Sequence, residues 1–168
     1  MKTLFFVNGP MGVGKTAVCR KLLRRLESSA YLDGDWCWNI NPFRVTDETK
    51  AMVMDNITAI LSRFLACPEL DYIIFSWVMH QPEIAQTILG RLDLSETNVK
   101  QYTLLCTEST LQKRIEQDIH DNLRSMDVLE RSLNYLPLYD RQNTIKIMTD
   151  DLSLDEIVNQ ILHKEGNP

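Results

Sequence analysis

The sequence predicts an α/β domain built on a five-stranded parallel β-sheet. Strand and helix signals alternate along all 168 residues, which is the pattern of repeated βα units. The first unit also encloses residues 9–16, a glycine-rich segment with the spacing G-x-x-x-x-G-K-[ST]. Hydrophobic residues make up 44% and charged residues 24%, so the chain is globular, and its length suits one domain over residues 1–168.

The first half of the chain contains two strand signals and two helix signals. Residues 4–7 are the short apolar run expected of a buried parallel strand. Apolar residues then recur at helical spacing as far as Leu26, and residues 30–32 form a brief second strand. A long helix is expected from about residue 47 to 66, because Pro68 marks its end.

The second half supplies the remaining strands. Residues 72–75 are the clearest buried strand, and a short helix is expected over 82–91. Further strands are predicted over 99–106 and 144–148. Together with the first two, these segments give five strands alternating with helices.

Two capping-box patterns predict helix starts. Ser109 with Gln112 predicts a helix that runs through Ile115, and an apolar stripe over 126–136 restores the helical spacing after a polar stretch. The second pattern, residues 153–156, predicts the start of a terminal helix with its apolar residues inward.

The glycine-rich segment fits the phosphate-binding loop of the Walker A type. Its glycines let backbone N–H groups approach phosphate oxygens, Lys15 places a positive charge on the β- and γ-phosphates, and Thr16 offers a hydroxyl to Mg²⁺. The alternative is a glycine turn that holds no phosphate. The residues expected to bind the nucleotide are Gly9, Met11, Gly12, Val13, Gly14, Lys15, Thr16 and Ala17.

Ligands of parallel sheets bind beyond the carboxyl ends of the strands, and several polar segments fall at those ends. They are residues 9–16, 33–35 and 76–80, and Thr107. This convergence predicts one ligand cleft at that edge of the sheet.

Composition also excludes several classes of protein. The formal charge of −5 argues against a nucleic-acid partner. The chain opens almost directly with a strand, so no signal peptide is expected, and no apolar run approaches the roughly 20 residues of a membrane span. The four cysteines form no C-x-x-C pair, so we expect no zinc and a reducing, cytoplasmic location where each cysteine packs as a small hydrophobe.

With the loop at its start and Leu-Asp-Gly-Asp at residues 32–35, the chain resembles the small P-loop kinases. Shikimate, gluconate and adenylylsulfate kinases and antibiotic-phosphorylating members share this pattern, and the likeness covers essentially the whole length. The resemblance implies a three-layer P-loop NTPase sandwich with strand order 2-3-1-4-5. It also implies ATP with Mg²⁺ as the phosphoryl donor and a mobile lid at approximately residues 115–130.

The same resemblance implies roles for the two aspartates. Asp33 would hold magnesium together with Thr16, through a water molecule, and Asp35 would orient or deprotonate the acceptor. A carboxylate within hydrogen-bond reach helps a hydroxyl attack at neutral pH, so the chemistry of the residues agrees. The alternative is that residues 33–35 form only a turn, which their composition suits.

The chain departs from the pattern of its relatives in two places. The third strand runs into Ser76 and Trp77, where many P-loop enzymes have an acidic magnesium ligand, so more weight falls on Asp33. The D-G-[YF]-P-R segment of several nucleoside monophosphate kinases is also missing. A phosphate-bearing acceptor is therefore less expected, although Arg44 could hold one.

The lid should supply cationic side chains that stabilise the transferring phosphoryl group. We expect Arg114 and Arg124 to be catalytic, with Arg131 in reserve. Relatives often place a second arginine about four residues beyond the first, but this chain has Asp118 there. The alternative for each arginine is an ordinary place on the surface.

The acceptor pocket is expected to form just after the acidic pair. Its tryptophans could stack on a planar substrate, or they could be the core that seats the following helix. His80 lines the same cleft without acting as a base, whereas His120 and His163 are expected on the surface. The residues expected to bind the acceptor are Asp35, Trp36, Trp38, Asn39, Arg44 and Trp77, with Asn41 and Phe43 beside them.

The leading functional hypothesis is an ATP-dependent kinase that acts on a hydroxyl of a metabolite, nucleoside or antibiotic. In this hypothesis Lys15 and Asp35 are catalytic, together with the lid arginines. The missing acid of the third strand motivates a second hypothesis, a nucleotide-binding module without catalysis. A third is a nucleoside monophosphate kinase. The acceptor, the physiological nucleotide and the oligomeric state stay open at this point.

Overall fold

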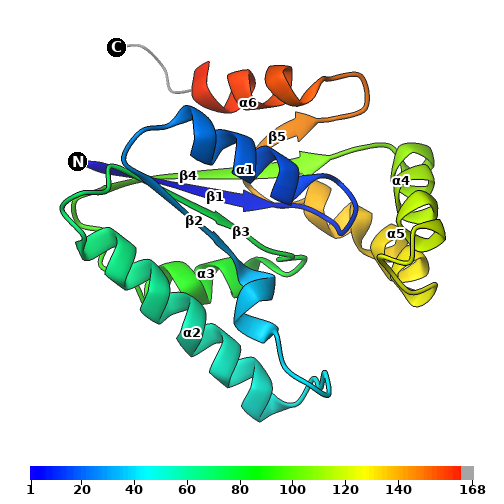
Figure 1. The fold of residues 1–168 in the computed structure, drawn as a ribbon, viewed down its shortest axis with the longest axis horizontal. Coiled ribbons are helices and arrows are strands. Elements are labelled where there is room, and N and C mark those ends of the chain that lie inside the picture. The colour runs from blue at the N-terminus through cyan, green and yellow to red at the C-terminus, as the bar shows by residue number, and fades with distance from the viewer. Residues whose placement is uncertain (164–168) are drawn as a thin grey trace.

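A computed structural model describes residues 1–163 and contains one five-stranded parallel sheet (Figure 1). The strand order β2-β3-β1-β4-β5 confirms the predicted fold class and topology. The strands are β1 (Lys2–Asn8), β2 (Ser29–Asp33), β3 (Tyr72–Ser76), β4 (Thr97–Leu105) and β5 (Ile145–Met148).

Helices cover both faces of the sheet, which gives three layers (Figure 1). Helices α1 and α6 lie on one face and α2 and α3 on the other, while α4 and α5 stand beyond the carboxyl ends of the strands. The helices are α1 (Lys15–Arg25), α2 (Asp47–Ala66), α3 (Pro82–Gly90), α4 (Glu108–His120), α5 (Asp127–Asp140) and α6 (Leu154–His163), with a short 3₁₀ helix η1 (Gly34–Trp38).

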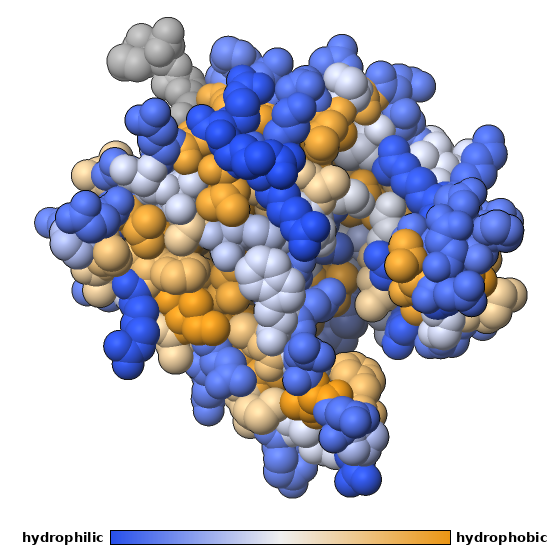
Figure 2. Space-filling model, viewed as in Figure 1, coloured by the Kyte–Doolittle hydropathy of each residue, from blue (hydrophilic) through white to orange (hydrophobic). Residues whose placement is uncertain are grey.

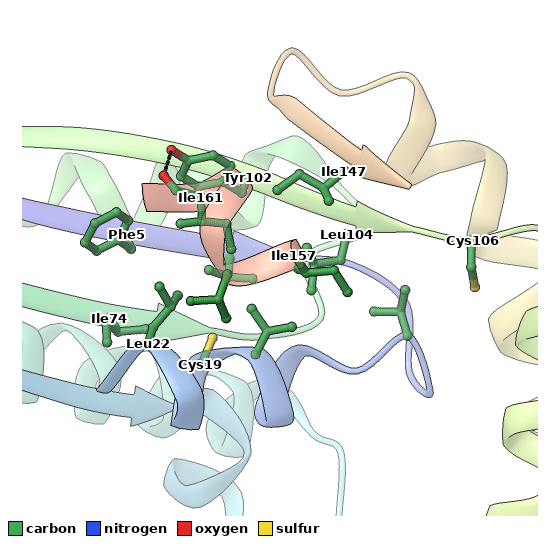
Figure 3. Close-up of a cluster of buried hydrophobic side chains, with 14 of the residues drawn as sticks. Phe5, Cys19, Leu22, Ile74, Tyr102, Leu104, Cys106, Ile147, Ile157 and Ile161 are labelled. Carbon is green, nitrogen blue, oxygen red and sulfur yellow. Dashed lines mark hydrogen bonds between the residues drawn. The ribbon is translucent and has the colours of Figure 1, made fainter. Parts of the chain in front are cut away.

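Two hydrophobic clusters hold the layers together, one on each face of the sheet. Because side chains alternate along a strand, β1 sends Phe5 and Val7 to the α1–α6 face and Leu4 and Phe6 to the α2–α3 face. In the first cluster, strand residues meet helix residues such as Leu22 from α1 (Figure 3). The β1 side chains are buried on both faces, which explains the continuous apolar run seen in the sequence.

The N-cap of helix α4 is Thr107, two residues before the predicted N-cap Ser109. The predicted capping box is wrong, because the side chain of Thr107 caps the helix and accepts a hydrogen bond from the backbone N–H of Thr110. Asp150, at the end of the last strand, fixes this start by accepting hydrogen bonds from both the backbone and the hydroxyl of Thr107. A contact between distant segments therefore decides where the helix begins.

The other capping prediction is confirmed. At the start of α6 the hydroxyl of Ser153 accepts from the backbone N–H of Glu156, and the Glu156 carboxylate accepts from the backbone N–H of Ser153. Helix α2 has the predicted bounds, and it carries a capping box between Thr46 and Thr49 that sequence reasoning missed.

The predicted lid, 115–130, falls on the end of α4, a turn and the start of α5. Helix α4 continues past Ile115 to His120, so part of this segment is helical. Its mobility stays a prediction. Among residues 1–163, no helix has both the length and the apolar character needed to cross a bilayer.

The strand register places polar side chains next to one another at the carboxyl edge of the sheet. Ser76 of β3 is paired with Val7 of β1 on one side and with Asp33 of β2 on the other. Residues in register on parallel strands point to the same face, here the face covered by α1. The glycine-rich loop leads into that helix, so the register brings Asp33 and Ser76 close to the loop.

Candidate functional site

The loop between β1 and α1 has three positions whose backbone dihedral angles favour glycine. Gly9, Gly12 and Gly14 all have positive φ, at 146°, 81° and 105°. A Cβ on Gly9 would lie 2.6 Å from the carbonyl oxygen of Leu104, and one on Gly12 would lie 2.7 Å from Ile115. Close packing against β4 and α4 therefore fixes the loop's shape.

The start of α1 is left open to an anion. Gly14 is the N-cap and provides no capping side chain, and the first turn contains no acidic residue. The first backbone N–H groups of a helix lack intrahelical partners and carry the positive end of the helix dipole. This end of α1 is therefore suited to bind phosphate.

Lys15, the first residue of α1, folds back over the loop. Its Nζ donates to the carbonyl oxygens of Gly9 at 2.8 Å and Pro10 at 2.9 Å. Burial lowers the pKa of Lys15 to about 8, although the carboxylates of Asp35 and Asp33 act in the opposite direction. The ammonium is thus held over the loop at a position where a polyphosphate would satisfy it better than two carbonyls.

A cavity of about 500 Å³ opens between the loop and the α4–α5 pair. Figure 2 shows the molecule hollowed between this pair and the layers of the sheet. The cavity brings together most of the predicted nucleotide-binding residues with both aspartates and both favoured arginines. Its lining includes Lys15, Thr16, Asp33, Asp35, Arg114 and Arg124.

Asp33 lies at the floor of this cavity and is only 7% exposed. Its Oδ2 accepts hydrogen bonds from the Thr16 hydroxyl at 3.0 Å and the Tyr31 hydroxyl at 2.9 Å. Its Oδ1 accepts from the backbone N–H of Asp35 at 3.2 Å. The carboxylate is therefore held in one orientation, with the side chain of Thr16 beside it.

Thr16 and Asp33 fit a magnesium ion that is bound together with a nucleotide. Mg²⁺ takes oxygen ligands and is usually held by one or two carboxylates plus substrate phosphates and water. Within residues 1–163 no group of three or more His, Cys, Asp or Glu side chains is placed to hold a metal. A hydroxyl and one carboxylate beside a phosphate-binding loop fit these ligand preferences of Mg²⁺.

Asp35 projects from η1 toward the same cavity. Its Oδ1 accepts a hydrogen bond from the indole Nε1 of Trp77 at 3.1 Å. Burial raises the pKa of Asp35, and the negative charge of Asp33 raises it further, while Lys15 acts in the opposite direction. An aspartate whose proton affinity is raised in this way is suited to accept a proton from a hydroxyl.

Gly34 is what allows Asp35 this position. A Cβ at residue 34 would lie 2.4 Å from Cγ of Trp77, so the indole packs directly on the glycine backbone. The same indole donates to Asp35. Residues 33–35 therefore do not form a free turn, because η1 and Trp77 fix both carboxylates.

The aromatic residues of the predicted acceptor pocket form two groups. Trp38 lies between Trp77 and Phe43, with ring centroids 6.3 Å and 5.6 Å away. Trp38 and Trp77 belong to the cluster that seats α2, whereas Phe43 is 65% exposed. Trp36 is 52% exposed and meets Tyr31 edge-on at 5.3 Å. Trp38 and Trp77 therefore pack as core residues, whereas the stacking of exposed Trp36 on a substrate stays a prediction.

Of the predicted acceptor residues, Asp35 lines the cavity, but the others do not: Trp36, Trp38, Asn39, Arg44 and Trp77. Asn39 and Arg44 are exposed. Arg44 contributes its backbone carbonyl, which accepts a hydrogen bond from the indole of Trp38 at 3.2 Å. Its side chain therefore lies outside the group formed by Asp33, Asp35 and Lys15.

The three arginines of the lid region occupy different environments. Arg114 donates to the carbonyl of Val13 at 3.1 Å and to both the hydroxyl and carbonyl oxygens of Thr149, so it links the loop to the end of β5. Arg124 lines the cavity and forms an ion pair with Asp118. Arg131 pairs with Asp127 and is not among the lining residues.

Sequence reasoning missed three polar side chains of α4 that line the cavity, Lys113, Gln117 and Asp118. Together with Arg114 they form two pairs spaced four residues apart, which is the spacing of one helix face. That spacing beside Arg114 was the signal that could have identified them.

Asn8, directly before the loop, was also missed. Its side chain is buried and bonds the backbone of Gly9 and of Met79. It also donates to Gln142, just beyond α5, at 2.9 Å. Asn8 thus ties the phosphate-binding loop to the segment after β3 and to the end of the α4–α5 pair.

His80 does not line the cavity. Its ring stacks on Tyr135 of α5 with centroids 4.3 Å apart, and burial lowers the pKa of His80. His120 and His163 are exposed, as predicted.

A family model described as an AAA domain matches residues 6–132 of the chain. This match includes the loop, both aspartates and the α4 helix. None of the curated proteins compared with the chain matches it.

Solved structures of similar fold cover almost the whole chain. The tunicamycin resistance protein of Deinococcus radiodurans is 19% identical with a TM-score of 0.71, covering 100% of this chain and 98% of that one. A gluconokinase from Sinorhizobium meliloti 1021 is 17% identical with a TM-score of 0.65 and 98% coverage of both chains. The shikimate kinase of Acinetobacter baumannii, solved with shikimate, is 18% identical with a TM-score of 0.61, covering 98% of this chain and 93% of that one. These likenesses establish a shared fold.

Proposed function

The chain belongs to the AAA domain family, and from this premise we propose that it is an ATP-dependent phosphotransferase acting on a hydroxyl of a small molecule. One observation carries the proposal. An open phosphate-binding loop, a hydroxyl–carboxylate pair suited to Mg²⁺ and a second carboxylate suited to a proton all line one cavity. Fold neighbours that are named as kinases support the same class of reaction.

The nucleotide end of the site would bind MgATP. Backbone N–H groups of the loop and of the start of α1 would hold the phosphates, and Lys15 would leave its two carbonyl partners for them. Thr16 and Asp33 would hold Mg²⁺, with Asp33 acting through water. When bound, this ion would neutralise charge that develops on the phosphates.

The acceptor end would be served by Asp35. The acceptor oxygen would attack the γ-phosphorus, forming a new O–P bond as the bond to the oxygen bridging the β- and γ-phosphates breaks. ADP would leave with that oxygen, and the hydroxyl proton would pass to Asp35. Arg124 would stabilise charge on the transferring group, and Arg114 would fix the loop from the other side.

The surroundings of Asp35 favour an acceptor that carries an uncharged, flat or apolar part. The indole of Trp77 meets the carboxylate, and the rings of Trp38 and Phe43 continue from it to an exposed edge. Arg44, the positively charged residue next to Phe43, is not among the residues that line the cavity. We therefore favour an amphiphilic alcohol over a sugar acid or a nucleoside monophosphate, and we place the reaction in the cytoplasm.

The deciding experiment is an ADP-release assay with MgATP over a panel of acceptors. The panel should pair neutral aromatic alcohols, nucleosides and phenicol-like antibiotics with shikimate-like acids, gluconate and nucleoside monophosphates. We expect turnover with a neutral aromatic alcohol and its loss in Asp35→Asn. Asp71→Asn is the matched control, since Asp71 is exposed just before β3, at the opposite edge of the sheet.

Two outcomes would replace the proposal with its alternatives. Turnover confined to nucleoside monophosphates would identify a nucleoside monophosphate kinase. Tight nucleotide binding with no ADP release on any acceptor would identify a binding module.

A further inference from the structure

The third strand ends without the acid that many P-loop enzymes place there, but a carboxylate lies directly beside that position. Ser76 occupies the end of β3, and Asp33 is its register partner on β2. A carboxylate therefore lies one strand away from that position, on the face that α1 covers. Hydrogen bonds from neighbouring side chains hold this carboxylate in place.

A buried chain of hydroxyls joins the two positions. Ser76 Oγ lies 2.8 Å from the Tyr31 hydroxyl, which lies 2.9 Å from Asp33 Oδ2. Ser76 is fully buried and Tyr31 is 7% exposed, so water does not compete for these hydrogen bonds. Their geometry is fixed by strand pairing on one side and by ring packing against Trp36 on the other.

The direction of each hydrogen bond follows from the number of protons available. A carboxylate at neutral pH only accepts, so the single proton of Tyr31 is donated to Asp33. The Ser76 hydroxyl must then donate to Tyr31. Thr16 donates to the same Oδ2 of Asp33, which leaves lone pairs of the Thr16 oxygen free to meet a cation.

We propose that Tyr31 and Ser76 are positioning residues that orient Asp33 and Thr16 toward Mg²⁺ in place of a third-strand acid. This inference rests on the proposed function for the presence of a magnesium nucleotide. Groups that orient metal ligands commonly change metal affinity by 10–100-fold when they are removed. The chain would therefore depend on two neutral hydroxyls to hold its magnesium ligands in place.

The test measures metal binding directly. Mn²⁺, which reports a magnesium site by its electron paramagnetic resonance signal, is titrated into the full chain with a non-hydrolysable ATP analogue. Tyr31→Phe should weaken Mn²⁺ binding about tenfold. Nucleotide affinity measured without metal, in the presence of EDTA, should stay unchanged, because Tyr31 is not among the residues that line the cavity.

Two further variants separate positioning from general damage. Tyr102→Phe removes another buried hydroxyl, one that donates to the Ile161 carbonyl far from the site, and should leave Mn²⁺ affinity unchanged (Figure 3). Ser76→Ala should weaken Mn²⁺ binding by about threefold, since it removes the donor to Tyr31. It also keeps the test decisive if Tyr31→Phe fails to fold.

A double-mutant cycle completes the experiment. If Tyr31 acts through Asp33, the effect of Tyr31→Phe should vanish in an Asp33→Asn background. Unchanged Mn²⁺ affinity in folded Tyr31→Phe and Ser76→Ala proteins, or an undiminished effect in that background, would overturn the inference. If the wild-type protein binds the Mn²⁺–nucleotide complex but transfers no phosphoryl group, only the proposed function is defeated. If it does not bind the complex at all, the proposed function and the present inference are both defeated.

Discussion

Oδ2 of Asp118 lies 2.7 Å from Nε of Arg124, and both side chains line the cavity above the phosphate-binding loop. Each side chain is about 30% exposed, so the pair is partly screened by solvent. The guanidinium of Arg124 is therefore paired with the carboxylate of Asp118 until the phosphates of a nucleotide compete for it.

We expect Arg124→Ala to lower kcat by about 10²-fold, because it removes a cation from the transferring group. Arg131→Ala is the matched control, since Arg131 pairs with Asp127 away from the cavity lining, and it should leave kcat unchanged. Steady-state kinetics on the best acceptor measures both. Equal losses in the two variants would show that the α4–α5 pair had simply been destabilised.

Asp118→Asn should have a different signature. The partly exposed pair contributes only about 0–1 kcal/mol to stability, so the free energy of unfolding should change little. Freed from its partner, Arg124 should bind nucleotide phosphates more readily, which lowers the KM for ATP. Urea denaturation and nucleotide titration check the two statements, and a higher KM for ATP would contradict the second.

Lys15→Met should lower kcat by at least about 10²-fold while the fold survives, since it removes the charge aimed at the β- and γ-phosphates. Circular dichroism and single-turnover phosphate transfer are the measurements. Lys50→Met removes a lysine on α2 that pairs with Asp47 away from the cavity lining, and it provides the control. A folded Lys15→Met protein with wild-type turnover would remove Lys15 from the site.

The same lysine predicts a pH dependence of stability. Its pKa falls from 10.5 in the unfolded chain to about 8 in the folded protein, chiefly through burial. Between these values the unfolded state binds the additional proton, so the free energy of unfolding should rise with pH from about 8 to 10.5. Denaturation of wild type and Lys15→Met over this range isolates the effect. A difference between the two that is independent of pH would contradict it.

Gly34→Ala should destabilise the protein by about 1–3 kcal/mol, because the new Cβ meets Trp77 at 2.4 Å. Moving Trp77 would also move Asp35, so kcat should fall with stability. Gly90→Ala is the control, since no atom lies within 4 Å of its Cβ position at the end of α3. Urea denaturation and steady-state kinetics measure both effects, and a stable, fully active Gly34→Ala protein would show that Trp77 yields freely.

What could be predicted from sequence depended on local patterns. The spacing from Gly9 to Thr16 identified the loop, and the apolar run of 72–75 identified a central strand, because burial on both faces leaves a direct composition signal. The neighbourhood of Thr16 and Asp33 also followed from the rule that strand ends converge.

The rest depended on contacts between distant segments. The start of α4 at Thr107 is fixed by Asp150, and Arg114 acts as a link because Val13 and Thr149 happen to flank it. The choice of Ser76 as a neighbour for Tyr31 depends on the register between β2 and β3. No window of sequence contains both members of any of these pairs, so propensity and spacing could not reveal them.

Asn8 gives the α4–α5 pair a fixed end. Its amide holds Gln142 and Met79 beside Gly9 through buried or partly buried hydrogen bonds. Breaking these hydrogen bonds would cost free energy, so a closing motion should leave them intact. We therefore expect the segment after α5 to serve as the pivot while the turn near Arg124 travels. Such an enzyme would close over its nucleotide by rotation of the α4–α5 pair about a point next to the phosphate-binding loop.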